Sequence, residues 1–467
     1  MTAPTISTIG ELRESGYQPR SVREELRANL VERIRTQEPL FAEIHGYEDS
    51  VIPQLQNAIL AGHDIILLGE RGQAKTRIAR TLTDLLDPWV PVIAGSEVND
   101  DPLAPVSTLG KARVAELGDA TPIEWLPRDA RFAEKLATPD TSVADLIGEV
   151  DPIKVAEGRY LSNEEIISYG LIPRTNRGIF NLNELPDLAE RIQVGLLNIL
   201  EEQDVQIRGF QVRMPIDILV VASANPEDYT NRGRIITPLK DRFGSQIRTH
   251  YPDTIELENQ IVDQERFRAE IPGVKVHLPA FMQDVITEIS HQARQSPVVS
   301  QRSGVSVRMT VANTETLVAN ATRRALRTGE AVAVPRVSDL DAILPSSMGK
   351  LEFETYGEGK DEHAFERIIG EAIKSIFLQT VDPSRLEPLV RAFENGLVVN
   401  TSDTADAFSY VHQVSAVESL SSLVSELVTT SSPQEMASAI EFVLEGLHQV
   451  RMISRRTRSG SGTSYSA

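Results

Sequence analysis

The chain has 467 residues, of which 47 are Lys or Arg and 67 are Asp or Glu, so its net charge at pH 7 is −20. This acidic balance argues against a general nucleic-acid or anionic-membrane binder, and the absence of cysteine excludes disulfides, zinc–thiolate sites and thiol nucleophiles. The length predicts roughly two to four domains. Without an apolar leader or a membrane-length apolar run, we expect a cytoplasmic protein with no membrane span.

The N-terminal third begins with two helical patterns that precede a short strand. Apolar residues recur at helical spacing over 20–35 and again over 41–62, and the apolar run 65–68 follows directly. We therefore predict an N-terminal helical extension over 1–36. An α/β core is predicted over 37–252.

A glycine-bearing turn joins the strand at 65–68 to a helix, and it reads Gly69-Glu70-Arg71-Gly72-Gln73-Ala74-Lys75-Thr76. Small residues in such a turn let successive backbone N–H groups point at a phosphate held at the helix N-terminus. Lys75 is spaced to reach the β- and γ-phosphates of a nucleotide, and the hydroxyl of Thr76 is spaced to bind Mg²⁺. Ala74 stands where a second glycine is usual. The alternative is an ordinary strand–turn–helix with a surface lysine.

The core continues with further strands separated by helical patterns. A strand is predicted at 89–94, and the long mixed stretch 95–176 is expected to be an insert. The strand at 178–182 ends in Asn183-Glu184, a helix follows, a hairpin is predicted at 205–213, and the strand at 216–222 closes on Ser223-Ala224-Asn225-Pro226. This alternation predicts a parallel sheet with helices on both faces. Ligands bind beyond the carboxyl ends of such strands, where Gly69, Glu184 and Asn225 would meet.

After residue 252 the pattern becomes helical. We predict a smaller helical domain over 253–350 and a further helical region over 351–458, with helices at 281–293, 310–328, 361–379 and 405–428. A capping box, Ser432-Pro433-Gln434-Glu435, opens a last helix whose apolar stripe is expected to be core or a subunit contact. The arginines at 451–458 are interpreted as solvated. The Ser/Gly-rich residues 459–467 are expected to be a disordered tail.

ATP hydrolysis requires a carboxylate that orients water, a polar side chain at the γ-phosphate, and cations that neutralise developing charge. Glu184 and Asn225 end successive strands and fit the first two roles. Taken singly, Glu184 could be a surface glutamate and Asn225 part of an Asn-Pro turn. Their order and spacing relative to Lys75 favour a shared site.

Residues 44–251 resemble the AAA+ ATPases of the MoxR and magnesium-chelatase I-subunit clade. The resemblance rests on the phosphate loop with alanine before its lysine, the stretch 170–179, the sensor 1 motif at 223–226, and the box Leu239-Lys240-Asp241-Arg242-Phe243. It continues more weakly to Ser306-Val307-Arg308. It implies a P-loop NTPase fold followed by an all-α lid, ATP and Mg²⁺ as cofactors, and a homo-oligomeric ring, usually a hexamer. It also implies a separate partner protein with a von Willebrand factor A domain.

The resemblance further implies roles for individual residues. The loop from Gly69 to Thr76 would bind the nucleotide, and Thr76 would contact Mg²⁺. Four catalytic residues are implied: Glu184 as the water-activating carboxylate, Asn225 as sensor 1, Arg242 as a finger that reaches the neighbouring subunit, and Arg308 as sensor 2. Arg174 is a second candidate for the contact between subunits. For Arg242 the alternative is an ion pair with Asp241 or another acid.

Position 183 departs from the clade, because Asn183 stands where the Walker B aspartate is usual. An amide keeps an oxygen for a Mg²⁺-bound water but lacks the charge that holds the ion, so we expect weaker metal binding and slow hydrolysis. The leading interpretation is an ATP-driven motor that remodels or assembles a partner protein. Alternatives are a nucleotide-gated scaffold with little or no hydrolysis and a genuine magnesium chelatase subunit. A sigma-54-type activator ranks lowest, since its GAFTGA loop is absent from the sequence and no basic recognition helix is evident.

Overall fold

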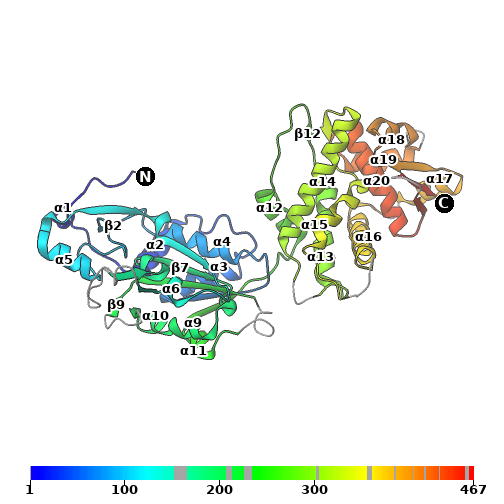
Figure 1. Cartoon of the computed structure of the whole chain (residues 1–467). Coiled ribbons are helices and arrows are strands. Elements are labelled where there is room, and N and C mark those ends of the chain that lie inside the picture. Colours follow the sequence, from blue (N-terminus) through cyan, green and yellow to red (C-terminus); the bar gives the residue numbers. More distant parts are fainter. Residues whose placement is uncertain are drawn as a thin grey trace. The chain divides into compact units, whose positions relative to one another are not determined.

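The protein is described from a computed structural model (Figure 1). The structure describes residues 2–151, 166–206, 213–225, 234–300, 304–354, 360–382, 385–402, 404–414, 417–430, 432–457 and 462–467. The chain divides into two compact units, Met1–His250 and Tyr251–Ala467. In the segments that are described, we find no helix with the length and apolar character needed to cross a bilayer.

A five-stranded sheet forms the centre of the first unit, in the order β11-β1-β10-β7-β4. The strands are β1 (Ile65–Leu68), β4 (Phe132–Leu136), β7 (Gly178–Asn183), β10 (Ile218–Ala224) and β11 (Ser245–Arg248). Every pairing between them is parallel. Strands β7 and β10 are buried along their whole length, as expected for the interior of a parallel sheet.

Alternate residues of a strand point to opposite sides of the sheet. Because the central strands are apolar on both sides, helices cover both faces. Ile65 and Leu67 of β1 pack in one hydrophobic cluster with α2 (Val22–Thr36), α3 (Val51–Ala61) and α4 (Lys75–Thr81). Ile66 packs in the other cluster, which includes residues of α9 (Glu190–Gly195), α10 (Leu197–Glu201) and α11 (Thr237–Arg242). The predicted α/β P-loop NTPase fold is confirmed.

Helix α2 lies within residues 1–36, the predicted N-terminal helical extension, and packs in this core. Val22, Leu26 and Leu30 are buried in the same cluster as β1. The carboxylate of Glu25 accepts two hydrogen bonds of 2.7 Å from the guanidinium of Arg131, and both side chains are buried. Apolar contact and a buried ion pair therefore join α2 to the sheet, and residue 36 marks no boundary in the packing.

The stretch 95–176 is more than an insert, because it contains β4, the edge strand beside β7. The predicted strand at 89–94 forms β2, which pairs with β3 instead of joining the central sheet. Strand β4 reads Phe-Ala-Glu-Lys-Leu. Charged residues are tolerated at a sheet edge, but they interrupt the apolar run by which a strand is predicted. The predicted hairpin forms as β8 and β9, while its turn at 207–212 lies outside the described residues. The remaining elements of this unit are α1 (Ile9–Glu14), β2 (Trp89–Ile93), α5 (Thr108–Leu117), β3 (Ile123–Pro127), α6 (Val143–Leu146), β5 (Gly148–Val150), β6 (Ile167–Tyr169), α8 (Leu171–Arg174), β8 (Asp204–Gln206) and β9 (Arg213–Pro215).

The second unit is mainly helical, and the predicted helix at 405–428 forms as two helices, α18 and α19. The helices are α12 (Ile255–Glu265), α13 (Ala280–Gln295), α14 (Val307–Thr328), α15 (Leu344–Met348), α16 (Lys360–Thr380), α17 (Glu387–Glu394), α18 (Ala407–Val414), α19 (Glu418–Leu427) and α20 (Pro433–Gln449). The strands are β12 (Lys275–Val276), β13 (Val332–Ala333), β14 (Val399–Ser402), β15 (Ser454–Thr457) and β16 (Gly462–Ser466).

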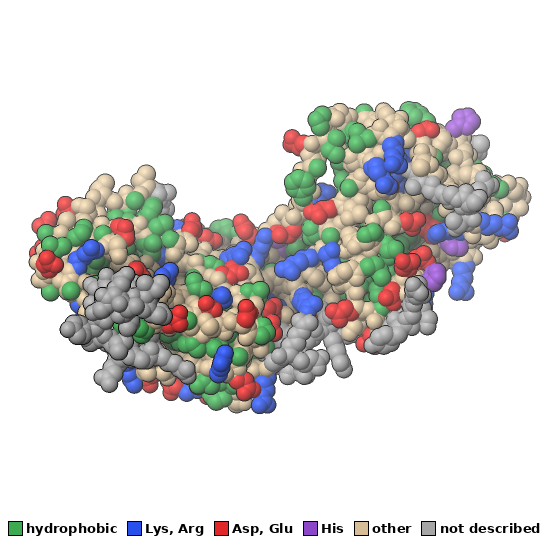
Figure 2. All heavy atoms as spheres, viewed as in Figure 1, with side chains coloured by type: hydrophobic (Ala, Val, Ile, Leu, Met, Phe, Trp, Pro, Cys, Tyr) green, Lys and Arg blue, Asp and Glu red, His purple; other side chains and the backbone are tan. Residues whose placement is uncertain are grey.

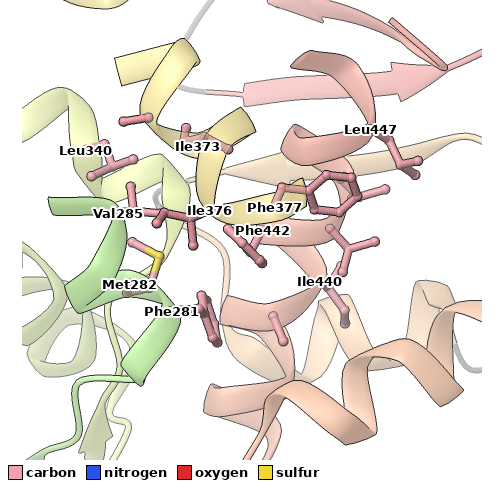
Figure 3. Packing of buried hydrophobic residues seen from close by; sticks show 14 of the residues in the cluster. Phe281, Met282, Val285, Leu340, Ile373, Ile376, Phe377, Ile440, Phe442 and Leu447 are labelled. Carbon is pink, nitrogen blue, oxygen red and sulfur yellow. The ribbon is translucent and has the colours of Figure 1, made fainter. Parts of the chain in front are cut away.

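One hydrophobic cluster extends across residue 350, where two regions were predicted. It includes Phe281 of α13, Phe377 of α16 and Phe442 of α20, which Figure 3 shows facing one another. The rings of Phe281 and Phe442 stack with their centroids 4.8 Å apart. The predicted apolar stripe of α20 is core. The described parts of 253–350 and 351–458 therefore share one interior.

Residues 462–466 form β16, although residues 459–467 were predicted to be a disordered tail. This strand pairs with β14 on one side and β15 on the other, and the backbone hydrogen bonds compensate for the small side chains of a Ser/Gly-rich segment. The buried hydroxyl of Tyr465 donates a hydrogen bond of 2.5 Å to Glu445 of α20, and Arg455 donates one of 2.9 Å. Part of the arginine cluster is therefore anchored.

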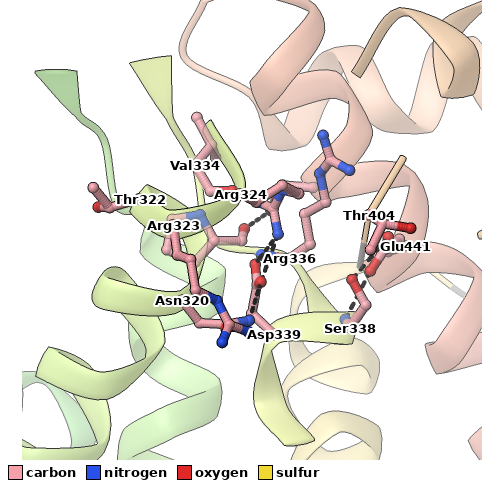
Figure 4. Close-up of polar contacts among 12 residues, drawn as sticks. Asn320, Thr322, Arg323, Arg324, Val334, Arg336, Ser338, Asp339, Thr404 and Glu441 are labelled. Atoms are coloured by element: carbon pink, nitrogen blue, oxygen red, sulfur yellow. Dashed lines mark hydrogen bonds and ion pairs between the residues drawn. The ribbon is translucent and has the colours of Figure 1, made fainter. Parts of the chain in front are cut away.

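Buried polar contacts also join the helices of the second unit. Asn320 of α14 donates a hydrogen bond of 2.7 Å to Asp339, which Arg324 also contacts (Figure 4). The backbone N–H of Ser338 donates one of 2.8 Å to Glu441 of α20, whose pKa is raised by burial. At the surface, Asp and Glu side chains lie among Lys and Arg on the face shown in Figure 2.

Candidate active site

The loop from Gly69 to Thr76 leaves the carboxyl end of β1 and enters α4. Gly72 and Ala74 have φ angles of +75° and +55°, in the left-handed region that favours glycine. Ala74 therefore accepts a strain of about 1–2 kcal/mol. A Cβ atom at Gly69 would lie 1.9 Å from Thr249 Oγ1 and 2.2 Å from Gln73 Oε1, so any larger residue there would displace these two side chains.

Residues at the end of β11 hold this loop in place. The side chain of Gln73 accepts hydrogen bonds from the Glu70 N–H at 2.9 Å and from the Thr249 hydroxyl at 2.7 Å. The Tyr47 hydroxyl lies 3.0 Å from the Gln73 carbonyl and 2.7 Å from the carbonyl of His250. Sequence reasoning did not identify Tyr47, Thr249 or His250. Residues 249 and 250 follow β11, which reads Ser-Gln-Ile-Arg and has no apolar run, so only the pairing of β11 with β1 places them beside the loop.

Lys75 connects the loop to the two neighbouring strands. Its buried ammonium donates to the carbonyl oxygens of Gly69 at 2.6 Å and Glu70 at 2.8 Å, and to Asn225 Oδ1 at 2.7 Å. Asn225 Nδ2 in turn donates to Glu184 Oε2 at 2.8 Å. Lys75, Asn225 and Glu184 therefore form one continuous chain of hydrogen bonds.

Glu184 follows β7 with a φ of +54°, an uncommon conformation for a residue other than glycine. Its backbone N–H lies 3.3 Å from Ser223 Oγ, on the neighbouring strand β10. Strained backbone of this kind clusters at functional sites. The conformation turns the chain at the edge of the sheet where the carboxylate meets Asn225.

The oxygens of Thr76 and Asn183 suit a magnesium ion. Thr76 Oγ1 lies 3.4 Å from Asn183 Oδ1, so two hard oxygen donors face the same space. Asn183 Nδ2 donates to Glu134 Oε1 at 2.7 Å, and Arg80 Nε donates to Glu134 Oε2 at 2.9 Å. Within the described segments, no group of three or more His, Asp or Glu side chains is placed to hold a metal. An ion here would therefore also need oxygens from the nucleotide and water.

The predicted arginines lie apart from this chain of contacts. Arg242 pairs with Glu201 of its own chain rather than with Asp241, and its Nε lies 2.8 Å from Glu201 Oε2. The exposed Arg174 lies 3.8 Å from Glu97. Arg308 is exposed at the start of α14 and belongs to the second unit.

Sequence relatives of this chain include magnesium-chelatase subunits. The subunit ChlI of Nostoc sp. is 29% identical over 232 residues, which cover 48% of this chain and 58% of the relative. The chloroplastic ChlI-1 of Arabidopsis thaliana is 26% identical over 231 residues, which cover 48% of this chain and 51% of the relative. A family model described as the Sigma-54 interaction domain matches residues 155–242, which include β7, β10 and Arg242. The chain is therefore similar to magnesium-chelatase subunits over about half of its length.

The chain spans about half the length of those two relatives. The match to the sigma-54 family model excludes the phosphate loop, and the GAFTGA hexapeptide is absent from the sequence. Among solved structures, a chain of the BchI–BchD complex of magnesium chelatase is 20% identical, with a TM-score of 0.37 and coverage of 69% of this chain and 98% of that chain. NtrX from Brucella abortus is 15% identical, with a TM-score of 0.39 and coverage of 78% and 72%. TM-scores below 0.5 do not establish a shared fold.

Proposed function

We propose that this protein binds ATP together with Mg²⁺ and hydrolyses the nucleotide at the carboxyl edge of its central sheet. The hydrogen-bonded chain from Lys75 through Asn225 to Glu184 carries the proposal. It brings a cation, an amide and a carboxylate from three neighbouring segments to one place beside the phosphate loop. These are the groups that phosphoryl transfer to water requires.

Each residue has a distinct role in this proposal. Lys75 exchanges its carbonyl and amide partners for phosphate oxygens, which bind an ammonium more strongly because they are charged. Glu184 accepts a hydrogen bond from water and orients it towards the γ-phosphate, and Asn225 holds the carboxylate in position. Thr76 and Asn183 would hold Mg²⁺ or its water ligands. When bound, the ion neutralises charge that develops on the phosphates.

Phosphate release from the purified full chain tests hydrolysis. We expect Lys75→Ala to lose nucleotide binding and turnover together, because the phosphate loop loses its charge. Glu184→Gln should retain nucleotide binding while turnover falls about 100-fold or more. Lys111→Ala removes an exposed lysine of α5 and serves as the matched control. Turnover that is insensitive to both site substitutions would contradict hydrolysis here.

A nucleotide-gated scaffold is the second candidate function, and Asn183 is the observation that favours it. An amide in place of a carboxylate weakens the hold on Mg²⁺, on which the hydrolytic step depends. The same experiment separates the two functions. Nucleotide binding that Lys75→Ala abolishes, combined with no phosphate release from the wild-type protein, would favour the scaffold.

We further propose that the protein works as a homo-oligomeric ring, a hexamer, that remodels or assembles a partner with a von Willebrand factor A domain. In the ring, Arg242 reaches the nucleotide of the adjoining subunit and Arg308 acts as sensor 2. The motif resemblance supports this proposal. A genuine magnesium chelatase subunit is the alternative that the names of the relatives support.

Electron microscopy with and without ATP and Mg²⁺ tests the ring, and particles that remain monomeric in both conditions would contradict it. A pull-down from the native host tests the partner. Recovery of a von Willebrand factor A protein without other chelatase components favours the remodelling motor. Recovery of chelatase components favours the chelatase subunit.

A further inference from the structure

The orientation of the Asn183 amide depends on its neighbours. Its Oδ1 accepts hydrogen bonds from Ser223 Oγ at 3.1 Å, Asn181 Nδ2 at 3.3 Å and Thr76 Oγ1 at 3.4 Å. Its Nδ2 donates to Glu134 Oε1 at 2.7 Å. A carboxylate can only accept, so a reversed amide would set its oxygen against the carboxylate of Glu134. Glu134 therefore holds Oδ1 towards Thr76.

The register of the sheet makes this contact possible. Strand β4 lies beside β7, with Glu134 opposite Asn181 and Leu136 opposite Asn183. Residues two apart on a strand share a face, so Glu134, Asn181 and Asn183 all lie on one side of the sheet. Glu134 reaches Asn183 along the diagonal between paired positions.

Glu134 also brings a negative charge to the place where the Walker B aspartate is missing. Its side chain is 26% exposed, and one hydrogen bond separates its carboxylate from the amide of Asn183. Arg80 contacts the other carboxylate oxygen at 2.8 Å and offsets part of the charge, although its own side chain is 63% exposed. Groups one contact removed from a metal orient its ligands and tune its affinity.

We infer that Glu134 and Asn183 together replace a single Walker B aspartate, and that Glu134 is the positioning residue of the Mg²⁺ site. The carboxylate turns the amide oxygen towards the ion and supplies the charge that the amide lacks. This inference rests on the proposed nucleotide site. An aspartate at 183 beside Glu134 would bring two carboxylates into contact, and one of them would have to take up a proton or move away.

Binding of a fluorescent ADP analogue, titrated first in EDTA and then with increasing Mg²⁺, tests the inference without relying on turnover. Glu134→Gln keeps a hydrogen-bond acceptor but loses the charge, whereas Glu134→Leu loses both. We expect the Mg²⁺ concentration for half-maximal effect to rise about 10-fold in Glu134→Gln and further in Glu134→Leu. In Arg80→Ala this Mg²⁺ concentration should fall, because the positive charge of Arg80 no longer offsets the negative charge of Glu134. Glu116→Gln, an exposed glutamate of α5, is the matched control.

Exchange of the two groups gives a second test. Asn183→Asp alone should lower the melting temperature and should not tighten Mg²⁺ binding. Asn183→Asp combined with Glu134→Gln should have a melting temperature and an Mg²⁺ dependence near the wild-type values. Wild-type Mg²⁺ dependence in Glu134→Leu would overturn the inference. So would tighter Mg²⁺ binding and an unchanged melting temperature in Asn183→Asp alone. A wild-type protein that binds no nucleotide in EDTA or in Mg²⁺ would instead overturn the proposed function.

Discussion

At the residue scale, Arg242 has an intramolecular partner that the proposed ring would replace. Its Nε donates to Glu201 and a terminal nitrogen donates to the Pro238 carbonyl, each at 2.8 Å. The Glu201 side chain is 54% exposed, and exposed pairs of this kind contribute about 1 kcal/mol or less. The guanidinium can therefore leave Glu201 at little cost when a neighbouring subunit offers a phosphate.

A comparison of two substitutions distinguishes the two roles of Arg242. If it acts as a finger, Arg242→Ala should reduce ATP turnover by about 1,000-fold or more while Glu201→Gln leaves turnover near the wild-type rate. If the ion pair is its only role, both substitutions should have the same small effect. Steady-state phosphate release measures this, and Glu202→Gln, also exposed, is the control.

At the element scale, the buried carboxylate of Glu258 joins α12 to α13 and α14. It contacts His291 Nε2 at 3.0 Å and accepts a hydrogen bond of 2.6 Å from Arg294 and another from Thr310. Burial by itself raises the pKa of Glu258, but the hydrogen bond from His291, the charge of Arg294 and the remaining hydrogen bonds outweigh it. They hold the pKa at about 2.

This low pKa predicts how the stability of the second unit changes with pH. The folded pKa of about 2 lies below the usual value of 4.5, so the contribution of Glu258 is present above pH 4.5 and is lost as the pH falls towards the folded pKa. Near neutral pH, Glu258→Gln should lower the free energy of unfolding by about 3–5 kcal/mol, because Arg294, whose side chain is only 12% exposed, loses its carboxylate partner.

Denaturant unfolding across this pH range measures the effect. The difference between wild type and Glu258→Gln should narrow as the pH falls below 4.5. Glu256→Gln changes an exposed glutamate of the same helix and should leave stability nearly unchanged. Equal stability of wild type and Glu258→Gln at neutral pH would contradict the prediction.

At the scale of the whole molecule, the two units have separate interiors. The clusters on the two faces of the central sheet belong to the first unit, and the cluster of α13, α16 and α20 belongs to the second. The phosphate loop and the strand ends that form the candidate site all lie in the first unit. A bound nucleotide therefore stabilises that unit directly.

Calorimetry tests this independence. We expect two unfolding transitions. Mg²⁺ and ADP should raise the temperature of the transition of the first unit, whose free energy of unfolding should increase by about 2.7 kcal/mol when the free ligand is at 100 times its dissociation constant. Lys75→Ala should abolish the shift without changing the second transition. A single transition that moves as a whole with ligand would show that the units unfold together.

The sequence by itself predicted the central strands at 65–68, 178–182 and 216–222, because strands buried on both faces require continuous apolar runs. It also predicted the phosphate loop and the convergence of Lys75, Glu184 and Asn225. The loop needs particular residue types at fixed spacing, and the carboxyl ends of parallel strands share one edge.

Only the tertiary structure decided which strands pair and which side chains contact one another. The sequence pattern did not predict β4, which contains charged residues, or β16, which is rich in Ser and Gly. Both strands are stabilised by pairing with strands distant in sequence. The sequence pattern also did not predict that Glu134 lies beside Asn183 or Glu201 beside Arg242. A local pattern records the propensity of a segment, whereas these contacts depend on the order of strands and the packing of helices.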